Sequence, residues 1–522
     1  MRTRGSAGVP RRYGCQAQRT RAKSSWPAVK GIELWFGGIG ARQRKLSGFG
    51  TGEVPRQVPS IDLSSVVHDP LQPNPGDDRL PLAAGEPGRT LAFVGGRAVS
   101  AATFLSQVRA VAALLPEAGH AVNLCQDRYR YLVAFCAVAL RGQATLMPPS
   151  RTRAAIDLVR GQFPDSYCIG DADDCGCDAN MARLGHYLRL PEPLPRLDGP
   201  PPRVVAGAVA AIGFTSGSTG TPEANAKTWG SFARSNRQNL DALAGLWPAG
   251  EQAHVVATVP PQHMYGMEMS VLLPLLGGTS VHAGRPFFAA DIADALAELP
   301  GNRLLVTTPV HLRALVESDA PLPPLCAIVT ATAPLPPELA AAAEERFGAP
   351  VREFFGSTET CIIASRRTAI ETAWTPFAGV QVQPRPDGTL VDAPHLAGPV
   401  ALADLVELDG AGRFILRGRQ ADLLEIAGKR ASLGELTRRL LEIPGVEDGV
   451  MLQLEDRDAL GVSRIAAIAV APGLDEAAIL QALRRAVDPV FLPRRLRLVD
   501  RLPRNETGKL PRAELLQLFR YG

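Results

Sequence analysis

Short apolar segments alternate with helix-length amphipathic segments along most of this chain, and this alternation restricts the fold more than any other feature. The apolar segments are four to six residues long and rich in β-branched residues, as is typical of buried strands. Strands that alternate with helices pair in parallel, and the helices pack on the faces of the sheet. We therefore predict an α/β fold of layered βαβ sheets. The expected strands are 91–94, 121–125, 144–148, 255–260, 279–282, 304–309 and 326–330, and the expected helices include 101–115, 128–141, 289–299 and 337–347.

The pattern changes after residue 355. The turn sequences PDG at 386–388 and DG at 409–410 predict short antiparallel strands, and hence a β-rich subdomain. Beyond residue 419, about a hundred residues mix helical and strand patterns, which indicates a small α+β domain. A chain of 522 residues is too long for a single core. We therefore predict a large domain at 61–418 and a small, mobile C-terminal domain at 419–522.

The first sixty residues differ in charge from the rest of the chain. They hold twelve Lys and Arg against two acidic residues, so the remaining residues are net acidic although the whole chain carries a formal charge of +4. We expect residues 1–60 to be a disordered extension or not part of the native protein. The acidic body gives no electrostatic reason to expect a nucleic-acid partner.

Two further classes of protein are disfavoured by composition. No apolar run approaches the roughly 18 residues that a membrane span needs, so we expect no transmembrane segment. The eight cysteines show no disulfide-like spacing, which favours a reducing, cytoplasmic location. Cys168, Cys175 and Cys177, with His186 further on, match no standard zinc spacing, and we interpret the sequence DADDCGCD at 171–178 as a loop.

A loop rich in glycine and hydroxyl groups, FTSGSTGTP at 214–222, follows an apolar strand pattern at 204–213 and precedes a helical pattern from about 227 to 246. Such a loop can approach a polyphosphate closely and donate hydrogen bonds from its backbone and its hydroxyls. The alternative is a flexible connection of ordinary Gly/Ser composition. It is not a Walker loop, because GxxxxGK[ST] is absent there. The candidate phosphate contacts are Thr215, Ser216, Gly217, Ser218, Thr219 and Gly220.

Further short motifs follow this loop in a fixed order. They are PPQHMYG at 260–266, TATAP at 330–334, FFGSTE at 354–359, GRFILRGRQAD at 412–422 and LPRNETGKLPR at 502–512. Together with the loop they resemble the motifs of the acyl-adenylate-forming superfamily. That superfamily includes acyl-CoA synthetases, aryl-CoA ligases, adenylation domains of nonribosomal peptide synthesis and luciferases. The resemblance covers about residues 90–522.

The resemblance implies a role for each matching residue. Phe355 would stack on adenine beside Gly356, Asp404 and Arg419 would bind the ribose, and Thr358 would contact a phosphate oxygen. Glu359 would bind Mg²⁺, and Lys509 would bridge the carboxylate and the α-phosphate. His263 would orient the carboxylate, and the acyl pocket would be lined by Met264, Tyr265 and Met267. These roles fit the chemistry, because a carboxylate becomes a good electrophile only when phosphate charge is compensated and the reacting groups are aligned.

The sequence also departs from the superfamily pattern. Glu223 occupies the position of a common lysine, and the nearest cation is Lys227, which could supply the missing charge. Ala421 stands at the usual Asp or Lys hinge, and Glu425 replaces a common lysine. The TATAP segment has alanines where the superfamily often has glycine.

The function implied by the resemblance is an ATP- and Mg²⁺-dependent acid–thiol ligase. It would convert a carboxylic acid into an acyl-adenylate and then into a thioester of CoA, or of the phosphopantetheine of an acyl carrier protein. We expect a fatty or aryl acid. Two alternatives stay open: adenylation of an aryl or amino acid for a separate carrier protein, and a non-catalytic nucleotide-binding relative.

Overall fold

The computed structural model describes residues 78–172, 187–216, 222–419, 423–426, 429–457, 463–505 and 508–520. All of these residues belong to one structural unit, Gln72–Gly522. The predicted extension at 1–60 lies outside the described residues, as do Cys175, Cys177 and His186 and the loop residues Gly217, Ser218, Thr219 and Gly220.

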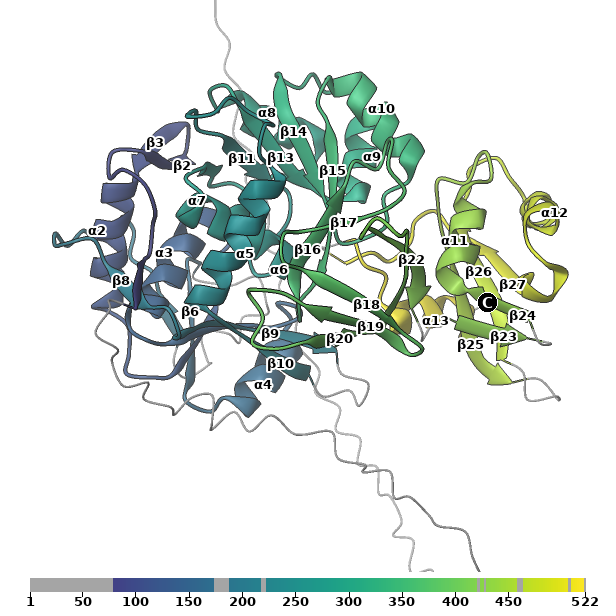
Figure 1. Cartoon of the computed structure of the whole chain (residues 1–522), viewed down its shortest axis with the longest axis horizontal. Helices are drawn as coiled ribbons and strands as arrows, with labels where there is room; N and C mark the ends of the chain where they lie inside the picture. Colours follow the sequence, from purple (N-terminus) through teal and green to yellow (C-terminus); the bar gives the residue numbers. More distant parts are fainter. Residues whose placement is uncertain are drawn as a thin grey trace, which may run out of the picture. The chain divides into compact units, whose positions relative to one another are not determined.

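A nine-stranded sheet forms the centre of the large domain (Figure 1). Its six inner strands run parallel, and the strands at both of its edges are antiparallel to their neighbours. All of its parallel strands except the one at Thr90–Val94 follow a helix, as the alternation predicts. In sheet order the strands are β17 (Thr375–Pro376), β16 (Cys361–Arg366), β15 (Val351–Ser357), β14 (Leu325–Thr330), β13 (Arg303–Thr307), β11 (His254–Ala257), β12 (Ser280–His282), β2 (Thr90–Val94) and β3 (Arg97–Ser100).

Consecutive residues of these strands point into different cores. Leu304 packs in one apolar cluster and Leu305 in another, and Val255 and Val256 divide in the same way. Both faces of the sheet are therefore buried, which explains why its strands are apolar throughout instead of alternating with polar residues. One face is covered by α8 (Ala289–Ala297), α9 (Pro309–Glu317) and α10 (Pro337–Phe347) (Figure 1). The other face packs against α6 (Met264–Met267), the π-helix η2 (Glu268–Leu272) and α7 (Leu273–Leu276).

A second, six-stranded sheet precedes most of the first in sequence. A single apolar cluster contains Ala121, Tyr167 and Ala211 from this sheet together with Leu304 and Val329 from the nine-stranded sheet. The two sheets therefore share one core. The strand order is β10 (Pro222–Thr228), β9 (Val209–Ser216), β5 (Ala144–Met147), β4 (His120–Asn123), β6 (Ser166–Gly170) and β7 (Tyr187–Arg189); its helices are α2 (Ala101–Ala112), α3 (Arg128–Leu140), α4 (Arg153–Gln162) and α5 (Trp229–Ala242), and β1 (Arg79–Pro81) pairs separately with β8 (Arg203–Val205).

The segment after the Gly/Ser loop differs from the sequence prediction. Residues 222–228 form a strand that pairs antiparallel with β9, and the helix begins only at Trp229. The side-chain oxygen of Thr228 accepts from the N–H of Ser231 and so defines the helix start. The helical prediction from residue 227 is therefore two residues early, and the loop connects two strands of a hairpin. Pairing with β9 overrides the weak strand preference of the sequence PEANAKT.

The β-rich segment and the C-terminal domain follow the predicted pattern. The turn at 386–387 joins β18 to β19, and the turn at 409–410 lies between β21 and β22. In the C-terminal domain, Met451 and Leu452 on β25 pack in different clusters, so its three-stranded sheet is covered by α11 and α12 on one face and by α13 on the other (Figure 1). The elements are β18 (Gln381–Arg385), β19 (Gly388–Asp392), β20 (Val400–Leu402), β21 (Asp404–Leu408), β22 (Phe414–Arg419), β23 (Leu423–Ile426), β24 (Lys429–Ser432), α11 (Leu433–Leu441), β25 (Asp448–Arg457), β26 (Ser463–Val470), α12 (Glu476–Ala486), η4 (Pro489–Phe491), β27 (Arg495–Leu498) and α13 (Arg512–Arg520).

The observed architecture is the predicted mixed α/β fold with large sheets. The domain boundaries at residues 60 and 418 stay predictions. Within the described part of the chain, no helix combines the length and the apolar character needed to cross a bilayer.

Candidate active site

The turn between β15 and β16 presents two of the predicted site residues, Thr358 and Glu359. Ser357 pairs with Cys361 across the hairpin. The N–H of Ser357 donates to Oγ1 of Thr360 and the N–H of Thr360 donates to Oγ of Ser357, both at 3.2 Å. Cys361 has a left-handed backbone with φ of 58°. The half-buried side chains of Thr358 and Glu359 therefore extend from a turn whose backbone is held by reciprocal bonds.

Gly356, which precedes this turn, has no room for a side chain. A Cβ at this position would lie 2.1 Å from the carbonyl oxygen of Cys361. The hairpin strands can approach this closely only with glycine on one of them. The glycine of the FFGSTE motif is thus required by the hairpin itself.

Phe355, the predicted adenine contact, is half-buried on β15. Its ring centroid lies 5.5 Å from that of Trp374 and 5.7 Å from that of Phe414. These contacts limit the motion of the ring and leave part of its surface accessible. A purine stacked on that surface stays a prediction.

Asp404 and Arg419, the predicted ribose contacts, face each other across β21 and β22. Nε of Arg419 donates to Oδ1 of Asp404 at 3.1 Å. The side chain of Arg419 is 61% exposed, whereas that of Asp404 is only 17% exposed. The strand register therefore brings together two residues that are fifteen positions apart in sequence.

Lys509 lies in a tight turn of the C-terminal domain. Its N–H donates to Oδ1 of Asn505 at 2.9 Å, and Gly508 adopts a φ of 77°. Arg504 anchors this turn by donating both to the carbonyl of Gly508 and to the carboxylate of Asp448 on β25. The turn is therefore fixed to the sheet of its own domain.

The same turn approaches the large domain. A Cβ on Gly508 would lie 3.4 Å from Cγ2 of Val310, at the start of α9. Desolvation lowers the pKa of Lys509, and the charge of Arg419 lowers it further, while Glu359 and Asp404 oppose this shift. Three residues predicted to bind ATP or Mg²⁺ thus lie within electrostatic range of the predicted catalytic lysine.

His263 precedes the first turn of α6 and is also close to this group. Burial lowers its pKa to about 4, and the charges of Lys509 and Arg285 act in the same direction. The imidazole is therefore neutral at physiological pH, and it can orient a carboxylate by hydrogen bonding but not by ion pairing.

The three side chains predicted to line the acyl pocket are all buried. Met264 and Tyr265 are 7% and 8% exposed, and Met267 is fully buried. The hydroxyl of Tyr265 donates to the carbonyl of Val329 at 2.9 Å. This bond fixes the phenol against β14, so the hydroxyl group is already satisfied within the protein. The role of the three residues in acyl binding stays a prediction.

The described part of the phosphate loop ends directly beneath the β15–β16 turn. Thr215 and Ser216 form the last residues of β9. A Cβ on Gly213 would lie 2.6 Å from Cγ2 of Thr358. The structure therefore brings the strand that leads into the loop against Thr358, although the loop's glycines lie outside the described residues. Gly213, the last residue of the strand pattern at 204–213, is thus a position of close approach between the two sheets.

The ammonium of Lys227 binds the backbone of the β15–β16 turn. The residue is 7% exposed, and its ammonium donates to the backbone carbonyl of Glu359. Its charge therefore acts from inside the protein on the backbone of the turn.

The segment 330–334, where the superfamily often has glycine, contains a strained backbone conformation. Thr332 has a φ of 81°, a conformation that costs a non-glycine residue of order 1–3 kcal/mol. The Oγ1 atom of Thr330, at the end of β14, is buried and makes no hydrogen bond within the described structure. Unsatisfied polar atoms and strain of this kind cluster at functional sites.

The side chains of the site are consistent with Mg²⁺ held together with substrate phosphates. Among the described residues, no group of three His, Cys, Asp or Glu side chains is arranged to hold a metal ion. Mg²⁺ in nucleotide sites is commonly bound by one or two carboxylates, and phosphate oxygens and water complete its shell. The single carboxylate of Glu359 fits that arrangement.

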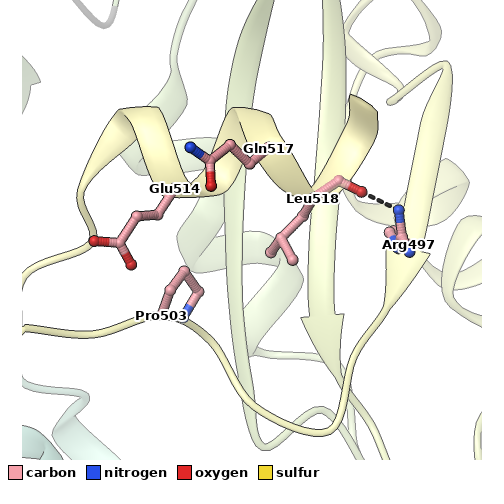
Figure 2. Close-up of a pocket in the computed structure, with 5 residues that line it drawn as sticks. All are labelled: Arg497, Pro503, Glu514, Gln517 and Leu518. Carbon is pink, nitrogen blue, oxygen red and sulfur yellow. Dashed lines mark hydrogen bonds between the residues drawn. The ribbon is translucent and has the colours of Figure 1, made fainter. Parts of the chain in front are cut away.

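A separate shallow pocket of about 330 Å³ lies in the C-terminal domain between β27 and α13 (Figure 2). The guanidinium of Arg497 donates to the carbonyl of Leu518 at its edge. None of its lining residues is a predicted contact of ATP, acid or metal, and we assign it no part in the reaction. They are Arg497, Pro503, Glu514, Gln517 and Leu518.

Comparison with known proteins identifies the family of this chain. Residues 82–395, more than half of the chain, match the family of AMP-binding enzymes. The chain belongs to this family. The AMP-binding enzyme is 32% identical over 317 residues to a 4-coumarate–CoA ligase of Rhodobacter capsulatus, a match that covers 57% of the chain and 74% of the relative. It is 27% identical to a sulfoacetate–CoA ligase of Cupriavidus necator over 84% of the chain and 91% of the relative.

Its fold is similar to that of the o-succinylbenzoate CoA synthetase MenE of Bacillus subtilis solved with ATP and magnesium. The TM-score is 0.71 at 19% identity, and the match covers 82% of this chain and 97% of the other. These comparisons confirm the predicted superfamily and fold class. They support the coarse assignment of an AMP-forming acid–CoA ligase type of enzyme.

Proposed function

We propose that this AMP-binding enzyme is an ATP-dependent carboxylate ligase that forms an acyl-adenylate and transfers the acyl group to a thiol. The observation that carries the proposal is the convergence of charge on Lys509. The pKa of this lysine responds to Arg419, Glu359 and Asp404, and Lys509 in turn contributes to the lowered pKa of His263. Residues from four separate motifs, together with Asp404, therefore lie within electrostatic range of one another through Lys509, which supports a shared site.

In the first step a carboxylate oxygen of the acid attacks the α-phosphorus of ATP, and pyrophosphate leaves. Negative charge is redistributed over the phosphoryl group, and the ammonium of Lys509 stabilises it. Neutral His263 holds the acid by hydrogen bonding, and Asp404 and Arg419 hold the ribose. Mg²⁺ held by Glu359 would compensate the charge of the phosphates when it is bound.

In the second step a thiol attacks the acyl carbonyl and loses its proton, the thioester forms, and AMP leaves. We propose that the C-terminal domain moves between the two steps, because the thiol needs access to a carbonyl that Lys509 approaches in the first. The acceptor is CoA or the phosphopantetheine of an acyl carrier protein. The printed names of the relatives, 4-coumarate– and sulfoacetate–CoA ligase, support CoA more directly than a carrier protein.

We propose a fatty or aryl acid as the substrate. The relative with 32% identity is named for an aryl acid, which supports the aryl class. The buried, apolar side chains of Met264 and Met267 support an apolar acid of either class.

The test is carboxylate-dependent exchange between ATP and pyrophosphate over a panel of fatty and aryl acids. Wild-type protein should exchange with at least one acid, and Lys509→Ala should abolish the exchange. Arg495→Ala is a matched control, since it removes one exposed positive charge from the same domain without touching a predicted contact. Nucleotide binding without exchange on the full panel would instead indicate a non-catalytic relative. Trapping the thioester with CoA or with a loaded carrier protein then identifies the acceptor.

A further inference from the structure

Two buried ionisable side chains, a lysine and a glutamate, lie behind the β15–β16 turn, and neither is assigned a direct contact with ATP or acid. Lys227 on β10 is 7% exposed, and Glu268 at the start of η2 is fully buried. Burying charged groups is costly, and replacing a buried ion pair by apolar residues often leaves stability unchanged or increases it. The presence of both charges therefore calls for an explanation other than stability.

Lys227 acts on the backbone of Glu359. Its ammonium donates to the Glu359 carbonyl, which is its one hydrogen-bond acceptor in the described structure. A hydrogen bond from a charged donor is stronger than one between neutral groups, so it restrains this peptide firmly. The restrained residue is the one predicted to bind Mg²⁺.

Glu268 acts on the other side of the turn. Its Oε2 atom accepts from the N–H of Ile362 at 2.9 Å. Its Oε1 atom accepts from the hydroxyl of Ser235 and from Nδ2 of Asn239, both on α5. The carboxylate thus links the turn to α5 and to η2. Since η2 continues directly from α6, the same contact connects the turn to the helix that begins after His263.

A third buried side chain, that of His395, also binds the backbone of the β15–β16 turn. Its Nε2 lies 2.7 Å from the carbonyl oxygen of Thr360, and its Nδ1 lies 2.7 Å from Oε1 of Gln238. The carbonyls of Glu359 and Thr360 and the N–H of Ile362 are therefore all bound by buried side chains. Each of these side chains comes from a different element of the fold.

The helix around Glu268 adds a second, independent observation. Residues 268–272 form a π-helix within an otherwise α-helical segment. Such insertions are rare and occur frequently at functional sites. The π-helical segment begins at the residue whose carboxylate reaches Ile362.

We propose that Lys227 and Glu268 are positioning residues that hold Thr358 and Glu359 for Mg·ATP and couple this turn to the helix that follows His263. The proposal rests on the proposed function, because that function assigns Mg²⁺ to Glu359. In this chain, where Glu223 stands at the position of the common loop lysine, Lys227 contributes its charge from beneath the turn.

The test measures how the affinity for ATP depends on Mg²⁺, by calorimetric titration of the full-length protein with ATP at a series of Mg²⁺ concentrations. Lys227→Met keeps most of the side-chain length and removes the donor. It should raise the Mg²⁺ concentration for half-maximal binding by about tenfold, the effect expected from losing one charged hydrogen bond. Lys227→Arg should restore most of the wild-type dependence. In the exchange assay, KM for Mg·ATP should rise while KM for the acid stays within about twofold.

Glu353→Gln is the matched control. Glu353 is another buried carboxylate on the same hairpin, and it accepts from a backbone N–H of Leu335 and from the hydroxyl of Thr368. It lies at the other end of the hairpin from Glu359, so its loss should lower the melting temperature without a matching change in Mg²⁺ dependence. An equal change in this control would show that the effect of Lys227→Met is general destabilisation, and would overturn the proposal.

Two further variants allow the same test if Lys227→Met does not fold. The double variant Lys227→Met/Glu268→Gln leaves no unpaired buried charge, and Ser235→Ala removes one neutral donor to Glu268. Both should shift the Mg²⁺ dependence in the same direction as Lys227→Met, with Ser235→Ala giving the smaller shift. Wild-type Mg²⁺ dependence in folded variants would overturn the proposal. Because binding is measured separately from exchange, a protein that binds Mg·ATP without exchange refutes the proposed function and still tests these residues.

Discussion

Glu268 should make the stability of the large domain depend on pH, and Glu268→Gln should remove that dependence. Burial raises the pKa of Glu268 from 4.5 to about 7, although hydrogen bonds from Ser235, Asn239 and Ile362 and the charge of Lys227 act against the shift. Between these two values the unfolded chain carries an ionised carboxylate while the folded protein holds a proton. The unfolded state then binds fewer protons, so stability falls as pH rises through this window.

The size of the effect follows from linkage. For pKa values of 4.5 unfolded and about 7 folded, this group lowers the stability by about 2.5 kcal/mol between pH 5 and pH 8. With an unfolding entropy of about 2.1 cal/mol/K per residue and roughly 340 residues, that corresponds to a shift of about 3–4 °C in Tm. Glutamine has nearly the same shape and does not ionise in this range.

The assay compares thermal unfolding of wild type and Glu268→Gln from pH 5 to pH 8, and takes the difference in Tm so that other titrating groups cancel. The Tm of Glu268→Gln, relative to that of wild type, should increase by a few degrees as pH rises from 5 to 8. A constant difference across the range would mean that Glu268 is ionised throughout, and a change of opposite sign would mean that Lys227 lowers its pKa below the ordinary value. Either result would refute the reasoning from burial.

Three other substitutions test the site. Gly356→Ala should destabilise the protein by about 1–3 kcal/mol in thermal melts, because its Cβ would meet the Cys361 carbonyl at 2.1 Å. His263 has a pKa of about 4 when folded and about 6.5 when unfolded, so wild type should lose stability as pH falls from 6.5 towards 4, and His263→Gln should not. Asp404→Ala should raise KM for ATP by about tenfold in the exchange assay and leave KM for the acid unchanged, since the proposed ribose contact and the partner of Arg419 are lost.

The substitutions of Gly356 and Asp404 each have a control in the same molecule. A Cβ on Gly301 would meet no atom within 4 Å, so Gly301→Ala should leave Tm nearly unchanged. Asp409 forms an ion pair with Arg413 at the far end of the β21–β22 pair, and Asp409→Ala should leave KM for ATP as it is. Equal effects in these controls would show that the measured changes are not specific to the site.

The sequence predicts the sheets well, because their strands are marked by their own residues. Apolar pairs such as Leu304–Leu305 indicate burial on both faces, and both residues are indeed buried in separate clusters. The strand at 222–228 was not predicted, because little in PEANAKT favours a strand. Its conformation is imposed by pairing with β9, and such a long-range effect is not encoded in the segment itself.

Some residues of the site could likewise be predicted from the sequence, and others could not. Motif order and position are enough to select Glu359, Asp404 and Lys509, and the structure brings Glu359 and Asp404 within electrostatic range of Lys509. Motif order and position miss Glu268, although a single acid within the apolar segment MEMSVLLPLL is a recognisable warning. Its contact with Ile362 joins residues 94 positions apart, so only the three-dimensional structure could reveal what the carboxylate binds.

The shared core of the two large sheets has a consequence for how this enzyme folds. Because Ala211 and Leu304 belong to the same apolar cluster, neither sheet can lose its partner without exposing that cluster to water. A fragment ending near residue 216 should therefore not fold autonomously, and the large domain should unfold as one cooperative block despite having two sheets. The β15–β16 turn and the strand β9 beneath it, which come from different sheets, then form and unfold together in one transition.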